Sequence, residues 1–173
     1  MAKAVSRVYP LPKVGDVVYM KCSAVYKNVA HFMICLGIDA KDCILWTVVV
    51  TSSRDDQEKF NKANGECGDV LVDIPQTAIK GLKYDSVVNA ASLVRVRVDE
   101  YQAERARSAR CCRGSISAPL LRKIRIGAGN STKLLSSKLK KSVNAIDANQ
   151  SVKSSSLVVL KPSALCAIKI SVK

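Results

Sequence analysis

Short apolar runs separated by turn residues fill most of the first hundred positions of the chain. The runs cover residues 17–20, 31–38, 43–50, 69–74, 84–88 and 93–98. Each has the length of a strand, and the β-branched Val48-Val49-Val50 favours a strand over a helix. In the last run apolar residues alternate with Arg95 and Arg97, which places both arginines on one solvent-facing side. This pattern predicts five or six short strands in a small closed or half-closed β-barrel.

Helix signals come later in the chain. The charged stretch 54–68 contains an Asn64-Gly65 turn and is interpreted as a loop. Ser117 followed by Pro119 is typical of a helix start. The predicted helix has an apolar face of Leu120, Leu121, Ile124 and Ala128, with Arg122, Lys123 and Arg125 directed elsewhere. A second helical piece is predicted after Ser131, with Lys138, Lys140 and Lys141 facing outward.

These elements predict a mainly β protein with a C-terminal helix and a basic, partly disordered arm. The predicted parts are an N-terminal segment at 1–13, a barrel at 14–110, a basic helical extension at 111–143 and a flexible Ser/Lys-rich tail at 144–173. The tail is rich in Ser, Asn and Lys, a composition that favours disorder.

The net charge of +14 is very unevenly distributed. Residues 1–100 hold 13 Lys and Arg against 12 Asp and Glu, whereas residues 101–173 hold 15 against two. Such asymmetry points to a polyanionic partner, and we expect RNA. A membrane is not expected, because no apolar run approaches the roughly 18 residues of a span. Residues 1–13 lack the apolar stretch of a signal peptide, so the expected location is the cytoplasm.

The sequence offers little for metal or cofactor chemistry. Seven cysteines are present without a C-x-x-C spacing, and His31 is the single histidine, so neither a zinc site nor any cofactor is expected. The cysteines are interpreted as reduced thiols. Motifs for nucleotide hydrolysis and for serine esterases are absent.

Four segments, in this order, resemble the PemK/MazF family of toxin endoribonucleases over about residues 14–140. They are Gly15-Asp16-Val17-Val18-Tyr19, Phe32-Met33-Ile34-Cys35-Leu36, Val48-Val49-Val50-Thr51-Ser52 and the stretch 81–96 with Asp85-Ser86-Val87. The resemblance implies an SH3-like barrel that cleaves single-stranded RNA without metal. It also implies a homodimer and an acidic antitoxin as a further protein partner.

The resemblance also implies site residues. His31 stands where the family has a catalytic arginine, and histidine suits acid–base work near neutral pH. Thr51 matches the family's second catalytic position, and Ser52 beside it is a further candidate for the catalytic site. The residues expected to contact RNA are Arg54, Lys83, Arg95, Arg97, Lys138, Lys140 and Lys141.

Each of these residues also has an ordinary structural interpretation. A histidine at a strand start is often a half-buried residue, and Thr-Ser after an apolar run often closes a strand with its own hydroxyls. Two alternatives to the nuclease therefore stay open. One is a non-catalytic RNA- or ribosome-binding module on the same barrel, and the other is an adaptor that binds protein segments.

Overall fold

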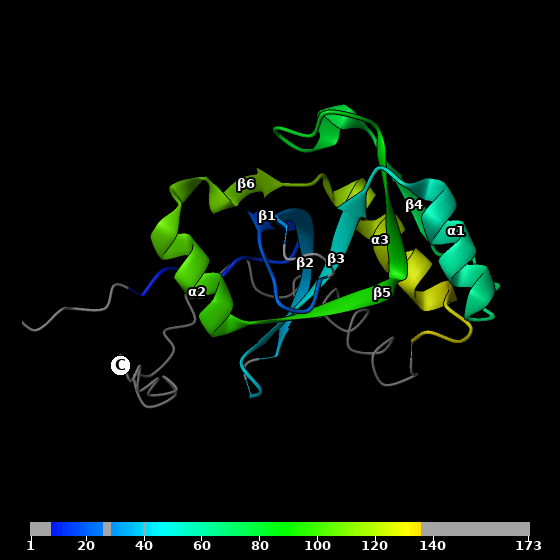
Figure 1. Ribbon diagram of the computed structural model, residues 1–173, viewed down its shortest axis with the longest axis horizontal. Coiled ribbons are helices and arrows are strands. Elements are labelled where there is room, and N and C mark those ends of the chain that lie inside the picture. Colours follow the sequence, from blue (N-terminus) through cyan, green and yellow to red (C-terminus); the bar gives the residue numbers. More distant parts are fainter. Residues whose placement is uncertain (1–7, 26–28, 40, 136–173) are drawn as a thin grey trace, which may run out of the picture.

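Six antiparallel strands curl into a half-barrel with helices around it (Figure 1). The computed structural model describes residues 8–25, 29–39 and 41–135. Its strands are β1 (Asp16–Met20), β2 (His31–Asp39), β3 (Ile44–Thr51), β4 (Leu71–Ile74), β5 (Ser86–Arg97) and β6 (Cys112–Ser115). They lie in the order β4-β5-β3-β2-β1-β6. The prediction of a mainly β protein is confirmed.

Helices lie in the connections between strands and after the last described strand, β6. They are α1 (Arg54–Ala63), α2 (Val98–Arg107) and α3 (Ala118–Asn130), with single 3-10 turns η2 (Gln76–Ala78) and η3 (Ala109–Cys111). Helix α3 begins directly after Ser117 with Pro119 in its first turn, where those two residues predict it. None of the helices in the described ranges is long and apolar enough to cross a membrane.

Alternation along the strands gives the sheet two apolar faces, each with its own core. The first core contains Ile34, Val48 and Val50 of the central strands and is covered by Ile124 and Ala128 of α3. The second contains Met33 and Leu45 from the opposite face and is covered by Tyr101 of α2. Because both faces are buried, the central strands read as continuous apolar runs.

The sheet continues past residue 110, the predicted end of the barrel. Strand β6 pairs with β1 through Asp16↔Ser115 and Val18↔Cys112. The Ser115 hydroxyl donates a hydrogen bond to Asp16, and the Ile116 N–H donates one to the Gly15 carbonyl at 3.0 Å. The first and last strands of the described chain are therefore neighbours.

The local structure differs from the expectations at four places. Residues 54–63 form α1 rather than a loop, and α2 was not expected. The two runs at 84–88 and 93–98 belong to the single strand β5. Arg125 does not face outward: it is 4% exposed, and burial lowers its pKa.

Glu66 fastens the chain that follows α3 to the turn that follows α1. One carboxylate oxygen accepts hydrogen bonds from the N–H groups of Gly68 and Thr132 and from the Thr132 hydroxyl, at 2.7–2.9 Å. The other accepts from the Ser131 hydroxyl at 2.7 Å and from the Lys133 and Leu134 N–H groups at 3.1 Å. We call these six bonds the Glu66 clasp. Burial opposes ionisation of Glu66, but the bonds from Thr132, Ser131 and Gly68 outweigh it and lower its pKa.

Candidate nucleic-acid interface

His31 and Thr51 come together at one end of the sheet. Strand β2 begins at His31, and β3 ends at Thr51. In the antiparallel pairing of these strands Phe32 lies opposite Val50, so His31 and Thr51 are the next residues on the two strands in the same direction. Because side chains alternate along a strand, both lie on the face that carries Met33 of the second core. Both are half-buried. The structure thus places the two candidate catalytic residues side by side.

The surroundings of this pair provide few of the groups that acid–base catalysis needs. His31 Nε2 is enclosed and has no hydrogen-bond partner within the described part of the chain. The Thr51 hydroxyl oxygen accepts a hydrogen bond from the Ser53 N–H at 3.2 Å, which is the turn-closing role of a Thr at a strand end. Ser52 beside it is exposed.

Arg54 follows Thr51 by three residues, but two carboxylates hold its guanidinium group. It forms ion pairs with Asp73 on β4 and with Glu58 one turn further along α1. A phosphate would have to compete with both carboxylates for this cation. Lys83 is exposed in the connection between β4 and β5, at the same end of the sheet as His31.

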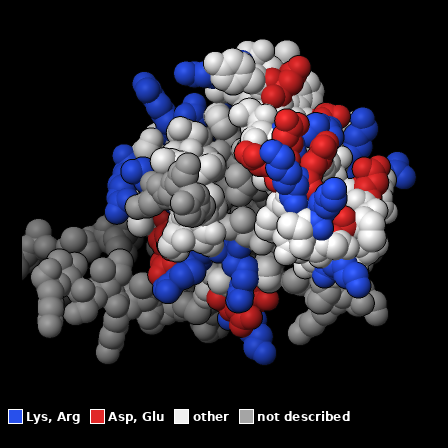
Figure 2. Space-filling view, turned by 45° about the vertical axis from the view of Figure 1, so that its right-hand side comes forward, with Lys and Arg blue, Asp and Glu red and all other residues white. Residues whose placement is uncertain are grey.

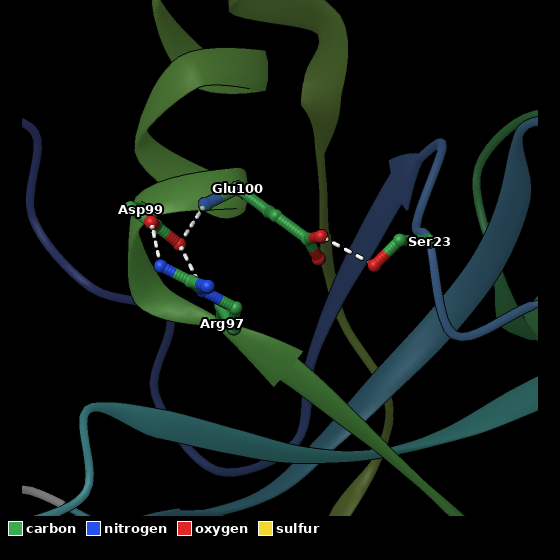
Figure 3. A network of polar contacts seen from close by, with 4 residues as sticks. All are labelled: Ser23, Arg97, Asp99 and Glu100. Carbon is green, nitrogen blue, oxygen red and sulfur yellow. Dashed lines mark hydrogen bonds and ion pairs between the residues drawn. The ribbon is translucent and has the colours of Figure 1, made fainter.

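Arg95 and Arg97 lie at the opposite end of β5, away from His31. Arg95 is paired with Trp46 on β3, and its guanidinium carbon is 5.4 Å from the Trp46 ring centroid. Arg97 forms an ion pair with Asp99 at the start of α2 (Figure 3). The hydrogen bond from Arg97 is the main reason for the lowered pKa of Asp99. The candidate RNA contacts are therefore divided between the two ends of the sheet, and Lys138, Lys140 and Lys141 lie outside the described residues.

The polar network around Arg97 also holds α2 against the strands. Asp99 accepts a hydrogen bond from the Glu100 N–H at 2.8 Å, and the Glu100 carboxylate accepts one from the Ser23 hydroxyl (Figure 3). Ser23 follows β1, so these contacts link the start of α2 to the end of that strand. The guanidinium group of Arg97 is thus paired with a carboxylate of the same chain.

A group that sequence reasoning missed lies at the His31 end of the sheet, on its other face. Tyr19 and Phe32 are cross-strand partners with ring centroids 4.7 Å apart. The guanidinium carbon of Arg113, on β6, lies 5.0 Å from the Tyr19 centroid and 5.8 Å from that of Phe32. We call these three residues the aromatic–arginine cluster. No local signal marks Arg113, because β6 has four residues and no apolar alternation.

Basic residues are concentrated in the last elements of the described chain. Residues 101–135 contain eight Lys and Arg, and their one acidic residue is Glu104, which pairs with Arg107. The described residues from 8 to 100 contain ten Lys and Arg and twelve Asp and Glu. Figure 2 shows both signs mixed on the side that carries α1, while basic side chains gather at the upper left apart from acidic ones.

Neither a metal-binding cluster nor a known relative identifies the chemistry of the described residues. In residues 8–25, 29–39 and 41–135, no group of three or more His, Cys, Asp or Glu side chains is placed to hold a metal ion. The six cysteines in these ranges are free thiols. No model of a known protein family matches the chain, and no curated protein matches its sequence.

Proposed function

We propose that this protein is an SH3-like barrel module that binds single-stranded RNA through the basic half of its chain. The observation that carries the proposal is the separation of charge along the chain, with 15 Lys and Arg against two acidic residues after position 100. The last turn of α2, with Arg105 and Arg107, and the exposed Arg122 and Lys123 of α3 carry part of this charge on the surface. An RNA strand or a ribosomal RNA surface is the polyanion that such a surface fits.

Binding of this kind should weaken steeply with salt, because each contacted phosphate releases condensed counterions. For about six contacts to a single strand, the slope of log K against log salt should be about −4. The measurement is fluorescence anisotropy of a labelled single-stranded RNA between 50 and 200 mM salt. Reversing the charge of Lys138, Lys140 and Lys141 should reduce the slope by about two.

The matched control reverses the charge of three exposed lysines outside the basic half. These are Lys41, Lys59 and Lys62. The control should change the slope by less than about one, since these lysines lie among acidic residues. A flat salt dependence, or no binding at 50 mM salt, would contradict RNA binding and favour the protein-adaptor function.

A second candidate function is the metal-independent endoribonuclease of toxin–antitoxin type. The adjacency of His31 and Thr51 supports it, since a base and a hydroxyl donor would stand at one strand end. A homodimer and an acidic antitoxin belong to this candidate. It ranks second because His31 Nε2 is enclosed and would have to become accessible to reach a 2′-hydroxyl group.

Cleavage in the presence of EDTA tests this second function. His31→Ala should lower the cleavage rate roughly 100-fold, the range for loss of a general acid or base. Thr51→Ala should cost about 10-fold, since a neutral hydrogen bond contributes about 1 kcal/mol. Both variants should keep the RNA affinity of the wild type, and a cooperative thermal transition should show that each is folded. A wild-type protein that binds RNA and leaves it intact would exclude the nuclease and leave the binding module.

A further inference from the structure

The aromatic–arginine cluster brings together four segments that are distant in the sequence. Tyr19 is the last residue but one of β1, Phe32 is the second residue of β2, and Arg113 belongs to β6. The fourth segment is the turn at Gly81: a Cβ atom added there would lie 3.5 Å from Arg113 Nη1 and 3.8 Å from Phe32 Cζ. Gly81 has a φ of +92°, a left-handed conformation that favours glycine. The turn therefore approaches the cluster through its backbone.

The cluster reaches the surface next to additional cationic and aromatic side chains. Tyr19, Phe32 and Arg113 are each half-buried, and Arg113 Nε has no hydrogen-bond partner among the residues that the structure describes. Lys80 and Lys83 flank Gly81, and both are exposed. Tyr84 follows them in the same connection and is 69% exposed. This connection therefore presents an exposed aromatic ring close in sequence to the two lysines.

We propose that the aromatic–arginine cluster binds an unstacked base of single-stranded RNA, while Lys80 and Lys83 contact the adjoining phosphates. The inference rests on the proposed RNA binding and names its ligand more closely. Arginine planes and aromatic rings stack on nucleobases, whose π-faces are available in a single strand and covered by neighbouring bases in a duplex. The combination of rings, a guanidinium group and lysines at one sheet end fits a base with its phosphates better than it fits phosphates alone.

Substitutions at Arg113 separate stacking from simple charge. Arg113→Lys keeps the charge but removes the planar group, so affinity for a labelled 12-nucleotide single strand should fall about 10-fold with an unchanged salt slope. Arg113→Gln should lose affinity similarly and also reduce the slope by about 0.7. Affinity for a duplex of the same sequence should change less than 2-fold in Arg113→Lys. Thermal midpoints of all variants establish that they fold.

An aromatic pair of variants provides a second, independent readout. Phe32→Leu should weaken binding of the single strand about 5-fold or more, and it should diminish the quenching of a 2-aminopurine base placed in that strand. The matched control is Phe60→Leu, which removes an exposed ring on α1, among the acidic residues. This control should leave both affinity and quenching unchanged.

The outcomes distinguish this inference from the proposed function. If the wild type binds no RNA at 50 mM salt, the proposed function fails and this inference fails with it. If the wild type binds RNA and both Arg113→Lys and Phe32→Leu bind it equally well, only the base site is overturned. Equal losses for single strand and duplex would reduce the cluster to a phosphate contact. A polyglutamate peptide tests binding of an acidic protein partner instead. If the wild type bound this peptide tightly and Arg113→Lys weakened that binding as much as it weakens binding of the single strand, the cluster would be assigned to an acidic protein partner.

Discussion

Glu66→Gln should lower the free energy of unfolding by about 3 kcal/mol, measured by urea denaturation at pH 7. The amide of Gln keeps one acceptor oxygen and turns an N–H group toward donors that previously met the other carboxylate oxygen. Those donors are the Ser131 hydroxyl and the N–H groups of Lys133 and Leu134. Charge-assisted hydrogen bonds contribute about 1.5–3 kcal/mol each, and a buried donor left without an acceptor costs about 1–3 kcal/mol.

A matched control is Glu58→Gln on α1. Its carboxylate is exposed and pairs with Arg54 within the same helix, so the expected change is below about 0.5 kcal/mol. If Glu66→Gln proved as mild as Glu58→Gln, the Glu66 clasp would not hold the chain after α3 in place.

The clasp also sets the direction of the pH dependence. The pKa of Glu66 in the folded protein lies below its ordinary value of 4.5. The unfolded chain therefore takes up the proton first as the pH falls, so the clasp stabilises the protein fully above about pH 4.5 and progressively less below it. Between pH 7 and pH 4, the wild type should lose more unfolding free energy than Glu66→Gln, which has no proton to bind at this position.

Gly68→Ala should destabilise the protein by about 3 kcal/mol or more. A Cβ atom at this position would lie 2.0 Å from the Asn130 carbonyl oxygen and 2.8 Å from its carbon. Neither backbone atom can move without shifting the end of α3 away from the turn at Glu66. Crowding a packed site costs typically 1–3 kcal/mol, and the loss of clasp bonds adds to it.

Gly65→Ala is the control for backbone conformation. Gly65 has a φ of +66° and open space where a Cβ would stand, so its substitution measures left-handed strain without a clash. That strain costs about 1–2 kcal/mol. The measurement is the urea midpoint of each variant. If Gly68→Ala were as stable as Gly65→Ala, the close approach of Gly68 to the Asn130 carbonyl would be contradicted.

Apolar runs predicted the strands well because each central strand is buried on both faces and leaves a continuous signal. Helix α1 gave no such signal, since Asn61 is its one buried residue and its apolar stripe is missing. Its charges were a usable sign, with Asp55 and Asp56 in the first turn and Lys62 in the last. Helix α2 has the same arrangement, from Asp99 and Glu100 to Arg105 and Arg107.

The candidate site was predictable where it depends on neighbouring strands. His31 and Thr51 each lie at the end of an apolar run, and consecutive antiparallel strands bring such ends together. The aromatic–arginine cluster depends instead on β6 returning to β1, a pairing between residues nearly a hundred positions apart that no local pattern marks. The sequence also does not mark which carboxylate an arginine will meet in the fold. The ion pairs of Arg54 with Asp73 and of Arg97 with Asp99 were therefore not predicted.

The position of β1 between β2 and β6 also has a consequence for biosynthesis. Among the described strands, β6 is the partner of the outer edge of β1, so this edge waits for its partner until Cys112–Ser115 has left the ribosome. At 5–20 residues per second, roughly 5–20 s of translation separate Met20 from Cys112. During that interval the nascent chain presents an unpaired edge rich in valine, which is a template for association with other chains. Truncated products that end before Cys112 should therefore depend on chaperones and should aggregate more readily than the finished protein.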